Sequence, residues 1–553
     1  MRSGWGGCSL VFLGAAWTAA QTAPAGPVPE IRGVVVEAGT NLPLADAQVT
    51  VITVSKTPAA FDDLPTAAKI ATDAQGAFRV SLDRFGNYLV QVEKAGYTDD
   101  GKNPIRNSPS NQYRVTLDNA HPAAEARFAL ARAGELTGRV VDDETGNPIP
   151  NFRVYPLALL YANGAPAQIG GKPAITDEEG RFAAAGLRPG DYLVEVRPQA
   201  LDQEQFLEKF SAKDLDVIDR DYHRAYWPGG GALDSVLPVQ VFPGASASVG
   251  TIRARQGPFY RIHVSIPAGG CTAGEKVRII AEMLEFMDSG GGGQGSCGKD
   301  YLLRNYEPGP YLFYFLGGTP ENRMRSILPL EVIDRNLDVT VPLGRGVDIV
   351  GRIVAAEGAS RPPMEKIRIY MRVTGPLQFA DEGDPVSPDA EGRFRFSNRP
   401  VARARMSVAG LAGNFDVREI HYNGSAVPDN IVSMNGTAMS HFVDIVVDDK
   451  PALVTGVVED SDTPVSRPHV VLIRWPVSAE DVFLSARSTT GDDSGRFQFT
   501  GLAPGQYRIL AVSPADAEQL DKPHVLERLL KHAESIELTP GGSLERSVKV
   551  ARW

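Results

Sequence analysis

Short runs of alternating apolar and polar residues recur along the chain. Residues 190–196 read Gly-Asp-Tyr-Leu-Val-Glu-Val, and residues 505–509 read Gly-Gln-Tyr-Arg-Ile. Runs rich in β-branched residues, such as 47–51 and 470–473, occur as well. A period of two is typical of strands that bury one face and expose the other. The pattern therefore predicts many short β-strands.

One opening strand occurs in four copies, each with a central glycine. The copies are residues 31–35, 136–140, 349–353 and 454–458. Gly33 and Gly138 are 105 residues apart, as are Gly351 and Gly456, and the 213 residues from Gly138 to Gly351 leave room for another unit. A degenerate copy at residues 260–264 fills that space. Because self-similarity at a fixed spacing indicates repeated units, we expect five.

A hairpin signature, in which Asp precedes Gly and Phe, follows the opening strands. It occurs at residues 72–78, 176–182, 389–394 and 492–497. Asp can bond backbone groups at such a turn, Gly can adopt positive φ, and Phe can restart an inward-facing strand. A Pro-Gly turn into another strand follows at residues 187–196 and 502–509. In the middle unit a glycine-rich insert, including residues 290–293, replaces the hairpin, and we expect it to form a floppy loop.

The spacing of strands and turns predicts a series of β-sandwiches. A chain of 553 residues is too long for one core, whereas a unit of about 100 residues can bury its own. The expected boundaries are a signal peptide at 1–20 and repeats at 27–132, 133–257, 258–346 (degenerate), 347–450 and 451–553. Residues 204–210 and 525–533 are expected to form short helices packed on the sandwiches.

The first residues have the features of an export signal. Arg2 precedes an apolar stretch at residues 9–20, which ends in Thr18-Ala19-Ala20. This stretch is too short to cross a bilayer, which needs about 20 apolar residues. We therefore expect an exported protein, either periplasmic, attached to the cell surface or extracellular, with no membrane span after cleavage.

The cysteines point to the same compartment. Cys8 lies in the signal segment, so Cys271 and Cys297 remain in the mature chain. Two thiols in an oxidising compartment indicate a single disulfide, and two unpaired buried thiols are the alternative. The disulfide would restrain the glycine-rich insert.

Composition and charge exclude one class of partner. The chain is 43% hydrophobic and 22% charged, as in globular proteins, and its 56 Gly and 41 Pro fit many turns. The formal net charge is −11. Binding to nucleic acid needs a clustered basic excess, so we expect no nucleic-acid partner.

The Gly-containing opening strand, the Asp-x-x-Gly-x-Phe hairpin and the Pro-Gly-x-Tyr strand together resemble the carboxypeptidase regulatory-like domain family. This resemblance implies a transthyretin-like or prealbumin-like sandwich, often grouped with carbohydrate-binding-like folds. The expected fold class is all-β, with five tandem Ig-like or prealbumin-like β-sandwich domains and short helical insertions. The resemblance also implies a non-catalytic module, of the kind found in tandem in exported bacterial proteins.

The candidate chemical motifs are weak. His524-x-x-Glu527 has the spacing of zinc carboxypeptidase ligands, but the large α/β domain of those enzymes is missing. Residues 293–299 match a phosphate-loop string, but Asp300 follows where Ser or Thr would hold Mg²⁺. Acidic turns such as residues 177–179 and 492–493 offer oxygens to Ca²⁺, although most such turns bind none. We expect no catalytic residue, no cofactor and no metal site.

Exposed aromatic residues are the remaining candidates, because their flat faces stack on sugar rings. The candidates are Tyr226, Trp227 and Trp475, with a further cluster at Tyr311, Phe313 and Tyr314. The alternation of apolar and polar residues favours core packing for most of them, and sugar contact is the alternative. The main hypothesis is an exported, non-enzymatic scaffold, adhesive or accessory protein of the bacterial envelope. The alternatives are a carbohydrate-binding protein and an accessory subunit of a peptidase or outer-membrane transport system. The expected partner is a polysaccharide or another envelope protein.

Overall fold

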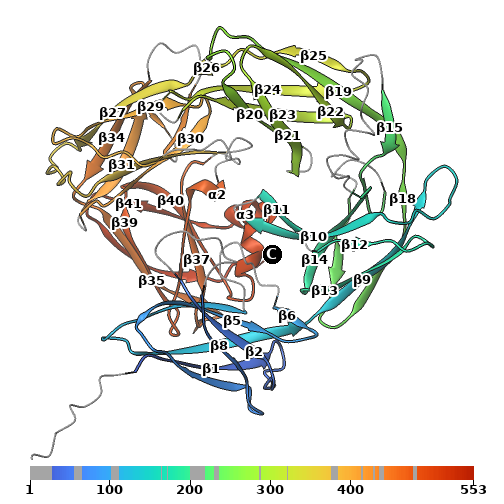
Figure 1. Cartoon of the computed structure of the whole chain (residues 1–553). Coiled ribbons are helices and arrows are strands. Elements are labelled where there is room, and N and C mark those ends of the chain that lie inside the picture. Colours follow the sequence, from blue (N-terminus) through green and yellow to red (C-terminus); the bar gives the residue numbers. More distant parts are fainter. Residues whose placement is uncertain are drawn as a thin grey trace, which may run out of the picture. The chain divides into compact units, whose positions relative to one another are not determined.

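The computed structural model describes residues 28–54, 65–100, 111–162, 165–170, 172–199, 218–229, 236–284, 288–319, 322–374, 384–412, 415–427, 430–434, 441–477 and 482–552. Strands make up nearly all of their regular structure, and short helices occur at α2 (Val482–Ser485), η7 (Ala517–Asp521) and α3 (Pro523–Leu530) (Figure 1). The predicted all-β fold is confirmed. The predicted signal peptide and the predicted helix at 204–210 lie outside the described residues.

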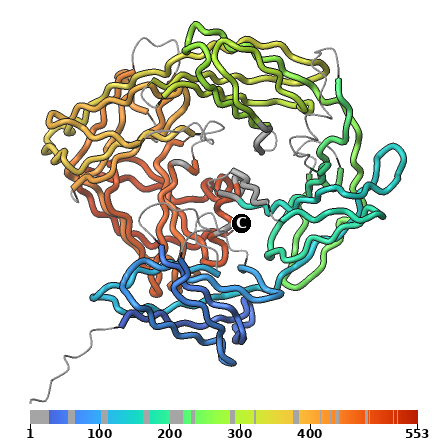
Figure 2. The backbone as a smooth tube through the Cα atoms, in the orientation of Figure 1, coloured from blue at the N-terminus to red at the C-terminus, as the bar shows by residue number. Residues whose placement is uncertain are grey.

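The chain divides after Ala133 into two compact units. The first contains one β-sandwich, seen as two layers of strands in the blue part of Figure 2. One sheet has the order β4-β1-β8-β6 and the other β3-β2-β5-β7, and Ile31, Val49 and Phe128 lie in the core. The strands are β1 (Glu30–Glu37), β2 (Gln48–Thr53), β3 (Thr66–Ala71), β4 (Ala77–Ser81), β5 (Gly86–Glu93), β6 (Tyr97–Asp99), β7 (Gln112–Leu117) and β8 (Ala123–Arg132).

The second unit begins with two further pairs of sheets, the second and third sandwiches. The second sandwich contains β9 (Gly134–Asp142), β10 (Arg153–Ala162), β11 (Ala165–Gly170), β12 (Ala174–Ile175), β13 (Arg181–Leu187), β14 (Gly190–Arg197), β16 (Ala225–Tyr226), β17 (Val239–Val241) and β18 (Ser246–Ala254). The third contains β15 (Asp219–Tyr222), β19 (Gln256–Ile266), β20 (Lys276–Met283), β21 (Asp288–Ser296), β22 (Lys299–Tyr306), β23 (Gly309–Gly317), β24 (Met324–Val332), β25 (Leu337–Thr340) and β26 (Gly344–Arg345).

The fourth and fifth sandwiches complete the second unit. The fourth contains β27 (Val347–Ala355), β28 (Arg368–Val373), β29 (Arg393–Arg399), β30 (Arg403–Ala409), β31 (Asp416–Tyr422), β32 (Ser425–Val427), β33 (Ile431–Ser433) and β34 (His441–Asp448). The fifth contains β35 (Ala452–Asp460), β36 (Thr463–Pro464), β37 (His469–Arg474), β38 (Ala486–Thr490), β39 (Arg496–Leu502), β40 (Gly505–Val512), β41 (Glu534–Leu538) and β42 (Ser543–Lys549). Here α3 buries Leu526, Leu529 and Leu530 against residues of β37 and β40, as expected for the helix predicted at 525–533.

All five sandwiches share one strand plan. The opening strand pairs in parallel with a strand near the end of the repeat, and the pairs are β1 with β8, β9 with β18, β19 with β25, β27 with β34 and β35 with β42. This second strand is the last one in every sandwich except the third, where the short β26 follows it. On its other side the opening strand pairs antiparallel with the hairpin strand, which is β4, β13, β22, β29 or β39. The strand that starts each repeat in the sequence is therefore central in its sheet.

The hairpin phenylalanine lies across the opening-strand glycine in four sandwiches. The facing pairs are Gly33 with Phe78, Gly138 with Phe182, Gly351 with Phe394 and Gly456 with Phe497. A Cβ atom on Gly33 would lie 2.8 Å from the Phe78 ring and 2.1 Å from the carbonyl oxygen of Ala126 on β8. Only glycine leaves room for the ring and the neighbouring strand together.

Aspartate builds each hairpin turn as the sequence indicates. Asp73 Oδ1 accepts hydrogen bonds from the amides of Gln75 (2.9 Å) and Ala77 (2.8 Å). The same Asp acceptor recurs at Asp177, Asp389 and Asp492. The turn glycines have positive φ, and they are Gly76 (69°), Gly180 (72°), Gly392 (83°) and Gly495 (78°). These local bonds fix the turn that brings each phenylalanine to its glycine.

A tyrosine closes the next turn in four of the sandwiches. Its hydroxyl donates to the carbonyl oxygen four residues earlier, and the pairs are Tyr88 with Arg84 (2.6 Å), Tyr192 with Arg188 (2.9 Å), Tyr311 with Glu307 (2.9 Å) and Tyr507 with Ala503 (2.8 Å). The rings are buried, so the bond satisfies a hydroxyl that would otherwise be costly in the core. This explains the repeated tyrosine of the Pro-Gly-x-Tyr pattern.

Residues 218–229 link the second and third sandwiches. Their β15 pairs with β19 of the third, whereas their β16 pairs with β14 of the second. Arg261 on β19 is fully buried, and its Nη2 lies 2.5 Å from Asp219 Oδ2 on β15. The predicted repeat at 133–257 therefore gives one strand to its neighbour, and its predicted end falls inside β19. The donation of β15 to the next sandwich depends on which distant strand it pairs with, and the local sequence pattern does not show this.

Charged groups are buried at this link. Glu195 on β14 is 3% exposed, accepts a hydrogen bond from the Tyr226 hydroxyl (2.9 Å), and lies 4.0 Å from Arg224 Nη1. Burial alone would lower the pKa of Arg224, but the nearby Glu195, Tyr226 and Glu307 outweigh it, and the pKa is raised. Burial also raises the pKa of the Glu307 carboxyl. The guanidinium therefore keeps its charge and compensates the buried carboxylate.

Substituting Gly456→Ala is expected to destabilise the fifth sandwich by about 2–4 kcal/mol. The new Cβ would lie 1.8 Å from the Arg546 carbonyl oxygen on β42 and 2.8 Å from the Phe497 ring, so the strands must separate. Hydrogen exchange of the β35 and β42 amides measures the loss. Gly344→Ala is the control, because no heavy atom lies within 4 Å of its Cβ, and it should cost no more than about 0.5 kcal/mol. Equal exchange in both variants would contradict the crowding argument.

Arg224→Met should destabilise the link by about 3 kcal/mol, because Glu195 would lose its buried cation. Arg197→Met is a matched control: its Nε lies 3.3 Å from Glu195 Oε1, but its side chain is 36% exposed, against 11% for Arg224. We expect about 1 kcal/mol for this more exposed pair. Hydrogen exchange of the β14 and β16 amides measures the loss of stability in each variant. Equal losses in the two variants would show that the burial of Arg224 does not add to its effect on stability.

Candidate functional site

Tyr226 does not reach the surface. It is 0% exposed, and its hydroxyl donates a hydrogen bond to the carboxylate of Glu195. The prediction that it is an exposed ligand contact was wrong, because β16 places its ring among core residues of the second and third sandwiches. The predicted cluster at Tyr311, Phe313 and Tyr314 is buried on β23 for a related reason, since both faces of that strand are covered. Alternation alone did not show that the second face is covered.

Trp227 and Trp475 are both half-buried. Trp227 packs against the core of the second sandwich, and its amide donates to the Val194 carbonyl (3.0 Å). The Arg508 guanidinium lies 4.8 Å from the centre of a Trp475 ring, in the fifth sandwich. Each indole thus keeps part of its surface exposed, and the two belong to different sandwiches.

A polar cavity lies on the first sandwich. It has a volume of about 630 Å³ and opens to solvent. It is formed by β2, β3, β5, β6 and β8 and by the segments that precede β2, follow β5 and precede β7. The lining residues are Asp46, Gln48, Lys69, Val92, Glu93, Lys94, Ala95, Tyr97, Thr98, Asn111 and Leu130. No sequence pattern indicated this site, because its polar residues come from several separate segments of the chain.

The cavity presents both donors and acceptors. Lys69 and Glu93 are exposed, whereas Lys94, Tyr97 and Thr98 are half-buried. Lys94 Nζ donates to the Ala45 carbonyl (2.5 Å), and Glu93 Oε1 accepts from Gln91 Nε2 (2.8 Å). The side-chain oxygen of Asn111 is buried and has no hydrogen-bond partner. The lining therefore carries two acidic and two basic side chains, together with one hydrogen-bond acceptor, on Asn111, that has no partner.

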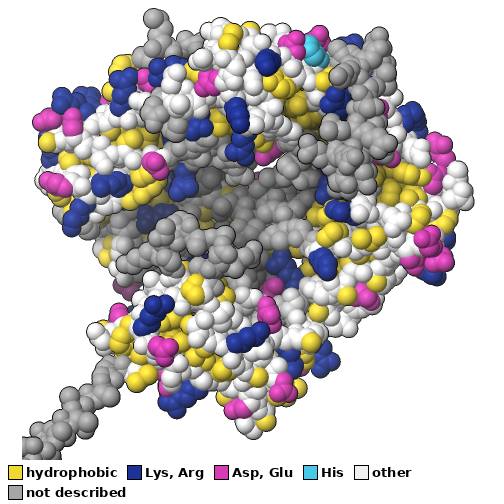
Figure 3. All heavy atoms as spheres, viewed as in Figure 1, with side chains coloured by type: hydrophobic (Ala, Val, Ile, Leu, Met, Phe, Trp, Pro, Cys, Tyr) yellow, Lys and Arg dark blue, Asp and Glu magenta, His cyan; other side chains and the backbone are white. Residues whose placement is uncertain are grey.

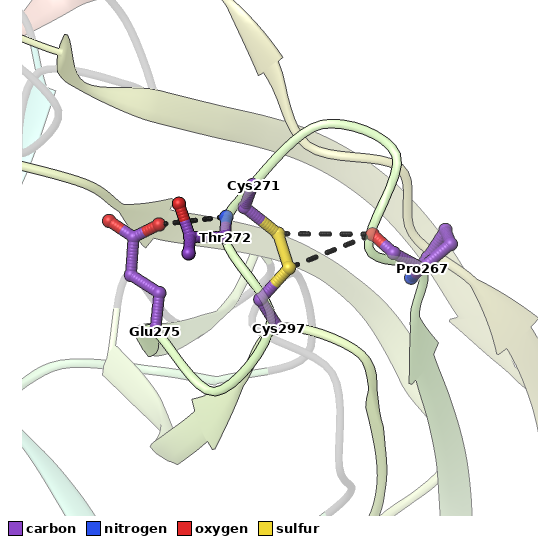
Figure 4. Close-up of a disulfide and its surroundings, with 5 residues drawn as sticks. All are labelled: Pro267, Cys271, Thr272, Glu275 and Cys297. Carbon is purple, nitrogen blue, oxygen red and sulfur yellow. Dashed lines mark hydrogen bonds between the residues drawn. A yellow bond between two sulfur atoms is a disulfide. The ribbon is translucent and has the colours of Figure 1, made fainter.

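Cys271 and Cys297 form the predicted disulfide, with an S–S distance of 2.11 Å. It joins the β19–β20 loop to the turn between β21 and β22 (Figure 4). Both sulfur atoms lie near the Pro267 carbonyl oxygen (3.8 and 3.9 Å), and these are contacts rather than hydrogen bonds because disulfide sulfurs carry no hydrogen. The loop is held further by the Thr272 amide, which donates to Glu275 Oε2 (3.1 Å).

The glycine-rich insert is a strand rather than the expected floppy loop. Its residues form β21, which pairs antiparallel with β20. Glycine forms the same backbone ladder as other residues, and the close approach of the Tyr301 ring, 3.0 Å from a Cβ on Gly295, favours it here. The phosphate-loop string at 293–299 therefore lies in a strand, a turn and the start of β22, with no helix to hold a phosphate.

The acidic turns use their carboxylates internally. The Arg181 amide does most to lower the pKa of Asp177, and the Arg393 guanidinium does most to lower that of Asp389. Arg181 also pairs with Glu179 (2.8 Å). Among the residues that the structure describes, no group of three or more His, Cys, Asp or Glu side chains is placed to hold a metal ion.

The surface carries charges of both signs. On the face drawn in Figure 3, Lys and Arg side chains lie interspersed with Asp and Glu. Several exposed cations are paired, such as Arg352 with Asp444 (2.7 Å) and Arg79 with Glu30 (2.6 Å). Within the described part of the chain, no helix is long and apolar enough to cross a membrane.

Solved structures that match parts of this chain include two bacterial pilins. The Bacillus anthracis TIE protein is 12% identical, with a TM-score of 0.16, over 58% of this chain and 51% of that one, so this chain spans about half of its length. The shaft pilin SpaA from Lactobacillus rhamnosus GG is 13% identical (TM-score 0.18; 42% of this chain, 98% of that one). The minor pilin GBS52 from Streptococcus agalactiae is 14% identical (TM-score 0.21; 42% and 97%). No curated protein matches the chain.

The family comparison agrees with the repeat pattern. The carboxypeptidase regulatory-like domain model matches residues 30–119 and again residues 135–217. The first stretch covers β1 to β7 of the first sandwich, and the second includes β9 to β14 of the second. The opening strand, the aspartate hairpin and the tyrosine turn described above lie inside both matches. Residues 30–119 and 135–217 are therefore two tandem stretches that match the carboxypeptidase regulatory-like domain.

Proposed function

We propose that this chain is an exported, non-enzymatic protein of the bacterial envelope that acts as a scaffold, adhesive or accessory module. The pairing of first and last strands supports this proposal. In the first sandwich β1 and β8 run in parallel over eight residue pairs, from Glu30 with Ala123 to Glu37 with Leu130. In the fifth, β35 and β42 do so over seven, from Leu453 with Ser543 to Glu459 with Lys549.

Parallel terminal strands resist pulling. The chain enters the first strand at one end of the pair and leaves the last strand at the other. A force on the two ends therefore shears the pair and loads its hydrogen bonds together rather than one at a time. Such a module holds tension well, as a surface scaffold or adhesive requires.

The connections between sandwiches also suit this role. A single residue, Arg255, separates β18 from β19, and three residues, 449–451, separate β34 from β35. Short connections leave little slack, so tension passes from one strand pair directly into the next. We propose that each predicted repeat is one unit that carries the applied force. The third unit also includes β15, which pairs with its β19.

Stretching the full chain between terminal handles tests the scaffold proposal. We expect discrete unfolding peaks, each releasing the length of one sandwich, because forced unfolding is governed by the barrier to shearing. Gly456→Ala should lower one peak, whereas Gly344→Ala should leave all of them unchanged. Smooth extension without peaks would refute the mechanical role. Hydrolysis of peptides or glycosides by the purified chain, lost on chelation, would refute the non-enzymatic one.

Carbohydrate binding is the second candidate function. The half-buried indoles of Trp227 and Trp475 support it, because a partly exposed aromatic face on a rigid sheet can stack on a sugar ring. The partner would be a polysaccharide of the envelope or of its surroundings. Binding of the full chain to a glycan array should fall on Trp227→Ala if this indole makes the contact, and unchanged binding would exclude it.

A further inference from the structure

The cavity of the first sandwich is lined by a residue pair that differs from the corresponding pairs in the other four sandwiches. Its floor includes Gln48 and Glu93, which face each other as the first pair of the β2–β5 ladder. The first pairs of the corresponding ladders are Arg153 with Arg197, Val277 with Gly317, Arg368 with Ala409 and His469 with Val512. The amide and carboxylate pair is thus particular to the first sandwich, although the strand plan is shared.

The charges of the lining select against simple ions. The ammonium groups of Lys69 and Lys94 attract anions, but the carboxylates of Asp46 and Glu93 lie in the same cavity. A phosphate would meet both carboxylates, and a cation would meet both ammonium groups. An apolar ligand would strip water from four charged groups without replacing their hydrogen bonds. None of these ligand classes matches the lining.

A hydroxyl-rich ligand could form hydrogen bonds with every polar side chain of the lining. Each hydroxyl donates one hydrogen bond and accepts others, so adjacent hydroxyls can bind a carboxylate and an ammonium group at once. The buried Asn111 oxygen has no partner in the protein, and an unsatisfied buried acceptor costs about 1–3 kcal/mol. A ligand hydroxyl at this position would remove that cost. Tyr97 adds an aromatic surface for the apolar face of a sugar ring.

The size of the cavity agrees with such a ligand. Its volume of about 630 Å³ lies within the range of ligand-binding pockets, roughly 300–1,000 Å³. The opening to solvent would let a chain continue outward from the bound end. We propose that this cavity binds a short, uncharged saccharide or the end of a longer one. The inference rests on the carbohydrate-binding function proposed above and gives it a site distinct from Trp227 and Trp475.

The test uses the full chain and defined probes. Immobilised cello-, xylo-, malto-, manno- and chito-oligosaccharides are screened first, and each hit is measured by calorimetry. We expect at least one hit, weakened about tenfold or more by Lys69→Met and by Asn111→Leu, since each removes a ligand hydrogen bond. Arg79→Met is the matched control, because it also removes an exposed cation of the first sandwich but lies outside the lining.

A second measurement covers the case in which Asn111→Leu disturbs folding. Bound saccharide should protect Lys69 of the unaltered protein from acetylation and leave Lys276 on β20 as reactive as before. Binding that falls only on Trp227→Ala would overturn the cavity proposal and leave carbohydrate binding intact. Equal effects of Lys69→Met and Arg79→Met would overturn it as well. Absence of any hit would overturn both, whereas the stretching experiment would still decide the scaffold role.

Discussion

The contact between the hairpin phenylalanine and the opening-strand glycine is the constraint on which four of the five sandwiches depend. It lets three strands approach so closely that a Cβ on Gly456 would lie 1.8 Å from the next strand. The third sandwich shows what replaces it. There Ile262 faces Leu303, and a disulfide instead of an aspartate holds the turn before β22. The strand plan survives because β19 and β25 still pair in parallel.

The parallel pair also connects the fold to its proposed role. It places the entry and exit of each sandwich at opposite ends of one hydrogen-bonded ladder. Buried residues of the ladder itself, such as the facing pair Val35 and Phe128, keep water away from one of its faces. Resistance to shear is therefore a property of the repeated plan rather than of any single residue, and it suits a chain that repeats the plan five times.

Specialisation occurs where the repeats differ. The segment between the second and third sandwiches supplies β15 to the third sandwich. It also places Arg224 beside the buried Glu195 of the second, so an ion pair adds to the backbone connection. Buried ion pairs add little net stability, but they penalise arrangements that would separate the partners. The first sandwich instead leaves polar groups around an open cavity. One fold thus supplies a rigid link at one repeat and a binding surface at another.

The local features of this protein could be predicted from its sequence. The glycine of the opening strand, the aspartate turn and the disulfide cysteines were predictable, because each acts over a few residues or repeats at a fixed spacing. The burial of Tyr226, the pairing of β15 with the third sandwich and the position of the cavity were found only in the folded chain. Tyr226 has the sequence context of an exposed residue, yet it is covered by residues far along the chain. Alternation indicates which face of a strand is buried, but coverage of the second face and the position of a cavity depend on contacts between distant segments, which local alternation does not specify.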